Sequence, residues 1–175
     1  EKGYDNLLTR QSLLGLKDLQ NAVPLLIEAR QRHLEPELVD NVLRNLGLSG
    51  IDYHPGYSLW VRTLASPWTW RGEVPVSAGE WQREKARQLF QVLITFRGQI
   101  LMRDQIIDML WPDLPPEPAQ RDFKVALNAL NHVLEPARPR STPPFFVIRN
   151  ENLYGLNPAA HIVLDADMFE QYAKV

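Results

Sequence analysis

The chain has 175 residues, of which 45% are hydrophobic and 23% charged, and its formal net charge is −2. This composition indicates a folded globular protein and excludes a disordered chain. The sequence contains no cysteine, which excludes disulfides, thiolate zinc sites and thiol catalysis. No apolar run approaches the length of a membrane span, and no signal-peptide pattern opens the chain. The lack of cysteine fits a reducing cytosol, and we expect a cytoplasmic protein. Because the chain begins in mid-pattern at Glu1 and stops at Val175 just after an apparent helix start, we expect a fragment of a larger protein.

Residues 1–50 are rich in leucine and have helical periodicity. Asp18 is a plausible N-cap, and residues 22–33 predict one helix with Pro24 in its first turn. Pro36 opens a second helix, which should stop at Gly47. Two short helices bury little surface by themselves, so this segment is typical of the end of a helical repeat array. A self-contained helical hairpin docked on the next domain is the alternative.

The pattern changes after a linker at residues 51–56, and residues 57–175 predict a second domain. Strand-like alternation at 57–64, 68–71 and 74–76 predicts a small antiparallel sheet. Three helices follow, at 81–96, 103–111 and 117–134, and two strands between 145 and 156 flank a turn at Asn150–Asn152. This order predicts an α+β fold, a winged helix-turn-helix with an N-terminal antiparallel sheet, three helices and a C-terminal β-hairpin wing. A short all-α segment precedes it.

The third of these helices has two unlike faces. Its apolar face is an ordinary core stripe, formed by Ala119, Phe123, Ala126, Leu127, Leu130, Val133 and Leu134. The opposite face has few carboxylates and many side chains that can hydrogen-bond to base edges in the major groove of DNA. Its members are Glu117, Gln120, Arg121, Lys124, Asn128, Asn131 and His132. Residues 81–156 carry ten cationic side chains against eight anionic ones, so this part is mildly basic although the whole chain is not.

The segment from Trp81 to Pro136, followed by FFVIRNENLYGLNP and LDADMFE, resembles the OmpR-type winged-helix domain of large bacterial transcriptional activators. The similarity covers residues 57–172 and rests on KARQLF, the LWP tripeptide, the helix end ALNALNHVLEP and the aromatic hairpin, in that order. The nearest groups are the SARP or bacterial-transcriptional-activator-domain proteins and the MalT-like STAND regulators. The resemblance implies a four-stranded N-terminal sheet, and a larger chain carrying an NTPase and helical repeats.

The resemblance also implies that the third helix enters the major groove of double-stranded DNA while the wing approaches the adjacent backbone or minor groove. The base-reading residues would be Gln120, Arg121, Lys124 and Asn128. The backbone and wing contacts would come from Lys85, Arg87, Arg103, Asn131, His132, Arg149, Asn150 and Asn152. The helix N-terminus at Arg103 is a further candidate phosphate site.

This chain departs from the antibiotic-regulator relatives where they carry paired arginines and it has Asn131 and His132. Two fewer cations mean two fewer possible phosphate contacts, so we expect weak and salt-sensitive DNA binding by the fragment alone. Tight binding would then require a dimer on DNA or tandem sites.

Other readings of the same residues remain open. The rival function is a winged-helix protein-interaction module, docking within its own chain or on RNA polymerase, with little DNA binding of its own. The Pro-rich connector at residues 111–120 either contacts RNA polymerase or is a stiff turn. Asp165 and Asp167 are expected to cap a helix starting near Met168 and not to bind a metal. We expect no enzymatic activity, cofactor or metal, and we expect Trp111, Phe146 and Tyr154 in the core.

Overall fold

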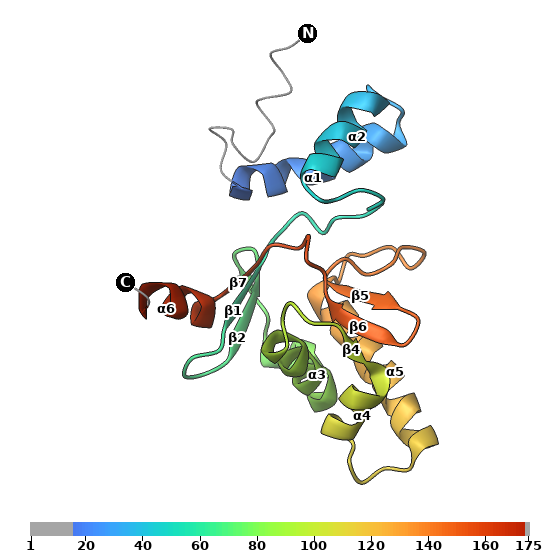
Figure 1. Ribbon diagram of the computed structural model, residues 1–175, viewed down its shortest axis with the longest axis vertical. Coiled ribbons are helices and arrows are strands. Elements are labelled where there is room, and N and C mark those ends of the chain that lie inside the picture. The colour runs from blue at the N-terminus through green and yellow to red at the C-terminus, as the bar shows by residue number, and fades with distance from the viewer. Residues whose placement is uncertain (1–15, 174–175) are drawn as a thin grey trace.

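The computed structural model describes residues 16–173, and side-chain surroundings are described for residues 22–173. Within this range the chain has a mixed α+β fold with six α-helices and two small sheets. Helices α1 (Leu16–Gln31) and α2 (Pro36–Asn45) lie at one end of the molecule, and α4 (Arg103–Leu110) lies at the other (Figure 1). The residues before 16, where the leucine-rich pattern begins, are outside the described part.

The two N-terminal helices form a hairpin, and the bounds of the second helix were predicted more accurately than those of the first. Helix α1 includes Asp18 and has Pro24 in its interior, so the prediction of a helix starting near residue 22 was wrong. Helix α2 starts at Pro36 and ends as predicted before Gly47, whose φ of +74° favours glycine. The amide of Gly47 donates to the carbonyl of Arg44 and that of Leu48 to the carbonyl of Leu43, which closes the helix as a Schellman motif.

The first sheet contains the three predicted strands and one that was not predicted. Strands β1 (Leu59–Arg62), β2 (Trp68–Arg71) and β3 (Val74–Pro75) are antiparallel neighbours. The fourth strand, β7 (Ile162–Leu164), pairs in parallel with β1, and the sheet order is β3-β2-β1-β7. The expectation of a purely antiparallel N-terminal sheet was therefore wrong, because its edge is completed by the C-terminal part of the chain.

Three helices and a second sheet follow the first sheet. Helix α3 (Glu84–Thr95) starts three residues later than predicted, because a 3-10 turn, η1 (Ala78–Trp81), precedes it. Helices α4 and α5 (Pro116–Leu134) are joined by the Pro-rich connector. Strands β5 (Val147–Asn150) and β6 (Leu153–Leu156) form the predicted hairpin, and the short strand β4 (Leu101–Met102) pairs with β6 to give the order β4-β6-β5.

A single aromatic cluster joins α4, α5 and the hairpin. The Phe123 ring of α5 lies 5.0 Å from the ring of Tyr154 on β6 and 6.3 Å from that of Trp111 at the end of α4, measured between centroids. Trp111, Phe146 and Tyr154 are buried, as predicted. Trp68 of β2, in contrast, is 44% exposed.

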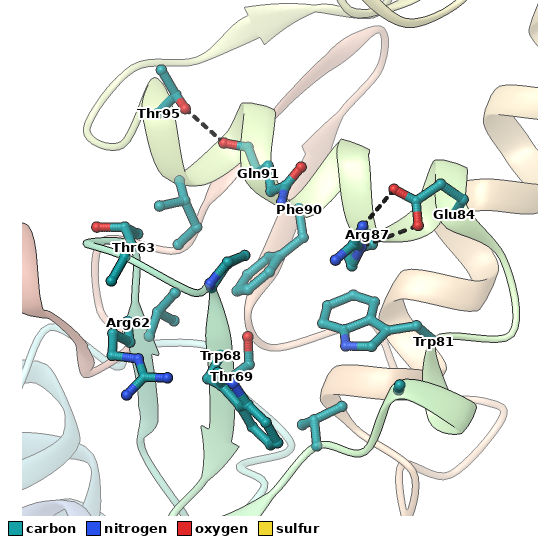
Figure 2. A pocket seen from close by; sticks show the side chains of 16 residues that line it. Arg62, Thr63, Trp68, Thr69, Trp81, Glu84, Arg87, Phe90, Gln91 and Thr95 are labelled. Carbon is teal, nitrogen blue, oxygen red and sulfur yellow. Dashed lines mark hydrogen bonds and ion pairs between the residues drawn. The ribbon is translucent and has the colours of Figure 1, made fainter.

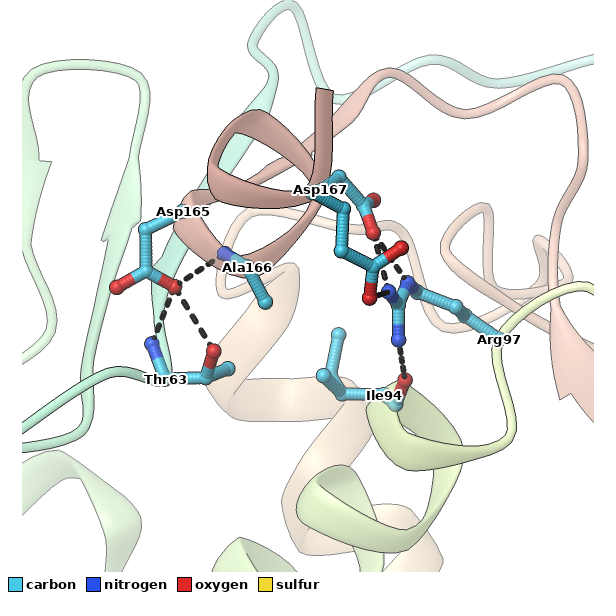
Figure 3. Close-up of polar contacts among 7 residues, drawn as sticks. Thr63, Ile94, Arg97, Asp165, Ala166 and Asp167 are labelled. Carbon is cyan, nitrogen blue, oxygen red and sulfur yellow. Dashed lines mark hydrogen bonds and ion pairs between the residues drawn. The ribbon is translucent and has the colours of Figure 1, made fainter. Parts of the chain in front are cut away.

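Two carboxylates attach the C-terminal helix α6 (Asp165–Ala173) to the rest of the fold (Figure 3). Asp165 accepts hydrogen bonds from the amides of Thr63 (2.7 Å) and Leu64 (3.0 Å) at the end of β1, and from the amide of Ala166 (2.9 Å). Asp167 forms an ion pair with Arg97, just beyond the end of α3. The helix begins at Asp165, three residues before the predicted start, and both carboxylates have structural partners.

We expect Asp165→Ala to lower the free energy of unfolding by about 1–2 kcal/mol, because it leaves the Thr63 and Leu64 amides without their acceptor. Urea denaturation followed by circular dichroism measures the loss. Asp113→Ala, in the exposed connector, is the matched control and should change the free energy of unfolding by less than about 0.5 kcal/mol. An equal effect of the two substitutions would contradict the anchoring role of Asp165.

Candidate nucleic-acid interface

Helix α5 is held at both ends by features of its sequence. Pro116 and Pro118 occupy the first turn, where the missing N–H groups have no intrahelical partner in any case. At the other end Tyr57 Oη donates to the carbonyl of Leu134 and Arg71 Nη1 to that of Val133, both at 2.6 Å. These two bonds satisfy helix carbonyls that would otherwise lack a partner, so Tyr57, just before β1, and Arg71 of β2 fix the C-terminal end of α5.

The polar face of α5 is largely open to solvent. Arg121, Lys124, Asn128 and His132 are exposed, and Gln120 is half-buried. Among the residues that the structure describes, no hydrogen bond or ion pair occupies the side chains of Arg121 and Lys124. Val125 lies on the edge of the same face and is 40% exposed. This valine was not among the predicted contacts, although it lies four residues after Arg121 and so one helical turn away.

Asn131 does not belong to this exposed face. It is only 6% exposed, and its Oδ1 atom is buried without a hydrogen-bond partner in the described residues. Its spacing from Lys124 and Asn128 favours the polar face, but η1 and Arg71 pack over the C-terminal turns of α5. The prediction of Asn131 as a DNA backbone contact was therefore wrong, because a neighbouring element covers that turn.

The hairpin presents a second set of exposed polar side chains beside α5. Arg149, Asn150 and Asn152 are all exposed, and Asn150 pairs with Leu153 across a two-residue turn. The Arg149 guanidinium lies 5.9 Å from the centroid of the Tyr154 ring, which in turn packs on Phe123. Arg149 Nε also donates to the carbonyl of Glu151 at 2.9 Å. Through Tyr154, the exposed Arg149 of the hairpin is thus connected to Phe123 on the buried face of α5.

Two of the predicted phosphate-binding cations are not available on the face of α5. Lys85 Nζ donates to the carbonyl of Leu110 and lies 5.4 Å from the centroid of the Trp111 ring, so it caps the end of α4. Arg87 forms a two-bond ion pair with Glu84 and faces the first sheet. Lys85 and Arg87 therefore have partners within the protein, which the sequence pattern alone could not reveal.

The first amide donor of α4 is already used by the hairpin. The amide of Arg103 donates to the carbonyl of Asn152 at 2.7 Å, and the amide of Met102 donates to Gln105 Oε1 at 2.9 Å. The Arg103 side chain is hydrogen-bonded to Asp104. The Arg103 amide is therefore not free for the phosphate predicted at this helix terminus, because the hairpin turn accepts its hydrogen bond. The same bond places Arg103 next to Asn152.

The exposed charges of α5 nearly balance. Arg121 and Lys124 are accompanied by the exposed carboxylates Glu117 and Asp122 on the same helix. A basic surface over a large area is therefore absent from α5, and attraction to a polyanion would depend on the position of the two cations relative to Arg149 and Arg103. This arrangement is compatible with the weak, salt-sensitive binding expected from the sequence.

Buried polar groups support the base of the hairpin and the end of α5. The carboxylate of Glu135 is 2% exposed and accepts hydrogen bonds from the amides of Phe145 (2.9 Å) and Phe146 (3.0 Å). Burial raises the pKa of Glu135, and these two bonds lower it in part. The His54 ring in the linker packs at an angle of 59° on that of Phe145, with 4.5 Å between ring centroids, and burial lowers the pKa of His54 to about 4. The linker is thus part of the packed structure.

Comparisons with known proteins do not identify a family. No protein-family model, no curated protein and no solved structure matches the chain. In the described part of the chain, no three His, Cys, Asp or Glu side chains gather in a way that could hold a metal ion. No helix in that part is long and apolar enough to cross a membrane.

Proposed function

We propose that this chain is a winged helix-turn-helix module that binds double-stranded DNA in a sequence-specific manner, as the output part of a larger bacterial transcriptional regulator. The observation that carries the proposal is that Arg121 and Lys124 are exposed and have no hydrogen bond or ion pair with any described residue, on a helix packed directly against a β-hairpin with an exposed arginine. A helix fits the major groove of B-form DNA, and arginine and lysine there bind the O6 and N7 atoms of guanine.

In this proposal some of the exposed residues contact bases and others contact the DNA backbone. Arg121, Lys124, Gln120 and Asn128 would contact base edges, and the methyl groups of Val125 would suit the methyl group of thymine. Arg149, Asn150, Asn152 and Arg103 would bind phosphates and sugars next to the groove and so fix the position of the helix. His132 would contact the backbone at the C-terminal end of the helix. The N-terminal helices leave Arg121 and Lys124 exposed, so the described arrangement supports an accessible surface.

The test is a fluorescence-anisotropy titration against a duplex selected from a randomised library, at several salt concentrations. We expect Arg121→Ala to weaken binding to the selected duplex by about 1–3 kcal/mol and to relax base preference at one position, because it removes a base contact. Arg44→Ala in α2, far from α5 in Figure 1, is the matched control and should leave the affinity unchanged. Equal affinity of wild type and Arg121→Ala would contradict the assignment of α5.

Protein binding is the second candidate function, and exposed apolar residues around the connector favour it. Met109 at the end of α4 and Leu114 in the connector are both exposed. Side chains of this kind are usual in protein contacts, and the site corresponds to the predicted RNA polymerase contact at residues 111–120. Failure of the wild-type protein to select any duplex, even at low salt, would support this function over DNA reading.

A further inference from the structure

Segment 51–57 passes between the two N-terminal helices and the rest of the molecule on its way from α2 to β1 (Figure 1). A connection that only joins two domains usually lies in solvent and makes few contacts. This segment instead contacts a helix on one side and a joint of the fold on the other. None of the proposed DNA contacts requires these interactions.

On the first side, Arg30 of α1 binds segment 51–57. Arg30 Nη2 donates to the carbonyl of Ile51 and to Asp52 Oδ1, the second at 3.1 Å. At the other end of the segment, a Cβ added to Gly56 would lie 3.7 Å from Cγ of Pro24, so the backbone there also lies against α1. The position of α1 therefore determines the position of both ends of the segment.

On the second side, the segment packs on the joint between α5 and the β5–β6 hairpin. At this joint the buried carboxylate of Glu135, one residue after α5, accepts hydrogen bonds from the amides of Phe145 and Phe146, shortly before β5. The His54 ring packs on that of Phe145, with 4.5 Å between centroids. The Tyr57 ring stacks on that of Phe146 at 5.9 Å, and Tyr57 Oη donates to the last carbonyl of α5. One short segment therefore contacts both halves of the joint.

The polar groups of the joint do not fully satisfy one another. Arg138 Nε lies 3.6 Å from Glu135 Oε2 and is buried without a hydrogen-bond partner in the described residues. Burial raises the pKa of Tyr53, and so does the Glu135 carboxylate, while the Arg138 guanidinium acts in the opposite direction, so Tyr53 lies beside this pair. A buried donor without an acceptor costs free energy, which it recovers once water can reach it. Release of the segment would let water in, and this gain offsets part of the contacts that are lost.

We propose that segment 51–57 couples the N-terminal helices to the joint between α5 and the β5–β6 hairpin, so that a displacement of α1 changes the position of the hairpin relative to α5. A displaced α1 would remove the bonds of Arg30, and the rings of His54 and Tyr57 would lose their support on the joint. The joint would then open to water, which gives the segment a bound and a released state. The use of this joint rests on the proposed function, because α5 and the hairpin would contact one DNA site together.

Hydrogen exchange of the Phe145 and Phe146 amides, measured by NMR in a ¹⁵N-labelled sample, reports the opening of the joint. We expect Arg30→Ala to speed their exchange by roughly fivefold or more, because it removes the bonds from α1 to the segment. In the described residues the Arg30 side chain has no bond to α5 or to the hairpin, so a selective effect travels through the segment. The amide of Trp111, which donates to the carbonyl of Ile107 at the other end of the molecule, is the internal reference and should keep its rate.

Two control variants each remove an arginine that pairs within a single helix. Arg32 pairs with Glu28 in α1 at 2.7 Å, and Arg87 pairs with Glu84 in α3 at 2.8 Å (Figure 2). Arg32→Ala and Arg87→Ala remove the same charge as Arg30→Ala but no bond to the segment. Both should leave the exchange of the two phenylalanine amides within roughly twofold of wild type, since exposed ion pairs contribute little to stability.

Unchanged exchange of Phe145 and Phe146 in Arg30→Ala would overturn the coupling. An increase of the same size at Trp111 would overturn it as well, because it would show a general loss of stability and not an opening of the joint. Failure of the wild-type protein to bind any duplex would contradict the proposed function and not the coupling, because the exchange rates are measured without DNA.

Discussion

Replacing Phe123 by alanine is expected to lower the free energy of unfolding by about 3–5 kcal/mol, the cost of a large cavity in a packed core. The ring is fully buried and contacts Trp111 and Tyr154, so its loss loosens α4, α5 and the hairpin together. Urea denaturation, followed by tryptophan fluorescence and by circular dichroism, measures the change.

Val125→Ala is the matched control for Phe123, two residues along the same helix. Val125 is 40% exposed, and alanine is the better helix former, which offsets part of the lost packing, so we expect a change in the free energy of unfolding within about 0.5 kcal/mol. If Phe123→Ala cost no more than Val125→Ala, the aromatic cluster would not be what joins α5 to the hairpin. If DNA binding is observed, Val125→Ala also tests the apolar contact proposed for its methyl groups.

The second large effect is a loss of stability in mild acid. The pKa of His54 is about 4 in the folded protein and 6.5 when the chain is unfolded. As the pH falls, His54 therefore becomes protonated in the unfolded state before it does in the folded state. This difference lowers the free energy of unfolding between about pH 6.5 and about pH 4. The full loss is about 3 kcal/mol, since each pKa unit corresponds to about 1.4 kcal/mol. Protonation would also remove the bond from the Gly56 amide to His54 Nδ1 (2.9 Å).

Denaturation curves at pH 7.5, 6.0 and 5.0 measure this dependence. Other groups titrate over the same range, so the informative quantity is the difference between variants. His54→Gln should show a flatter dependence than wild type, whereas His132→Gln, with an exposed side chain, should follow wild type. Parallel curves for wild type and His54→Gln would show that burial of His54 does not control the acid sensitivity.

The order of the helices and of five of the seven strands in residues 57–173 could be predicted from the sequence because it depends on local periodicity, whereas the short strands β4 and β7 were not predicted. The buried residues of α3 (Ala86, Leu89, Phe90, Leu93 and Ile94) and those of α4 and its end (Ile106, Ile107, Leu110 and Trp111) have the spacing of one helical face, which is visible in the sequence. Helix starts were less accurate. Helix α3 starts three residues after Trp81 and α6 three residues before Met168, since capping depends on contacts such as that of Asp165 with Thr63.

For the candidate DNA contacts, the sequence determined which residue types share a helical face, and so identified Arg121, Lys124, Asn128 and His132 as an exposed stripe. Only the tertiary structure decided that Asn131 is covered, that Lys85 and Arg87 have partners inside the protein, and that the Arg103 amide binds the hairpin turn. It also decided the parallel β1–β7 pair and the contact of Tyr57 with the end of α5. The physical reason is the distance along the chain over which each feature is decided. Helical spacing relates residues three or four apart, whereas burial and ion pairing depend on segments far apart in the sequence.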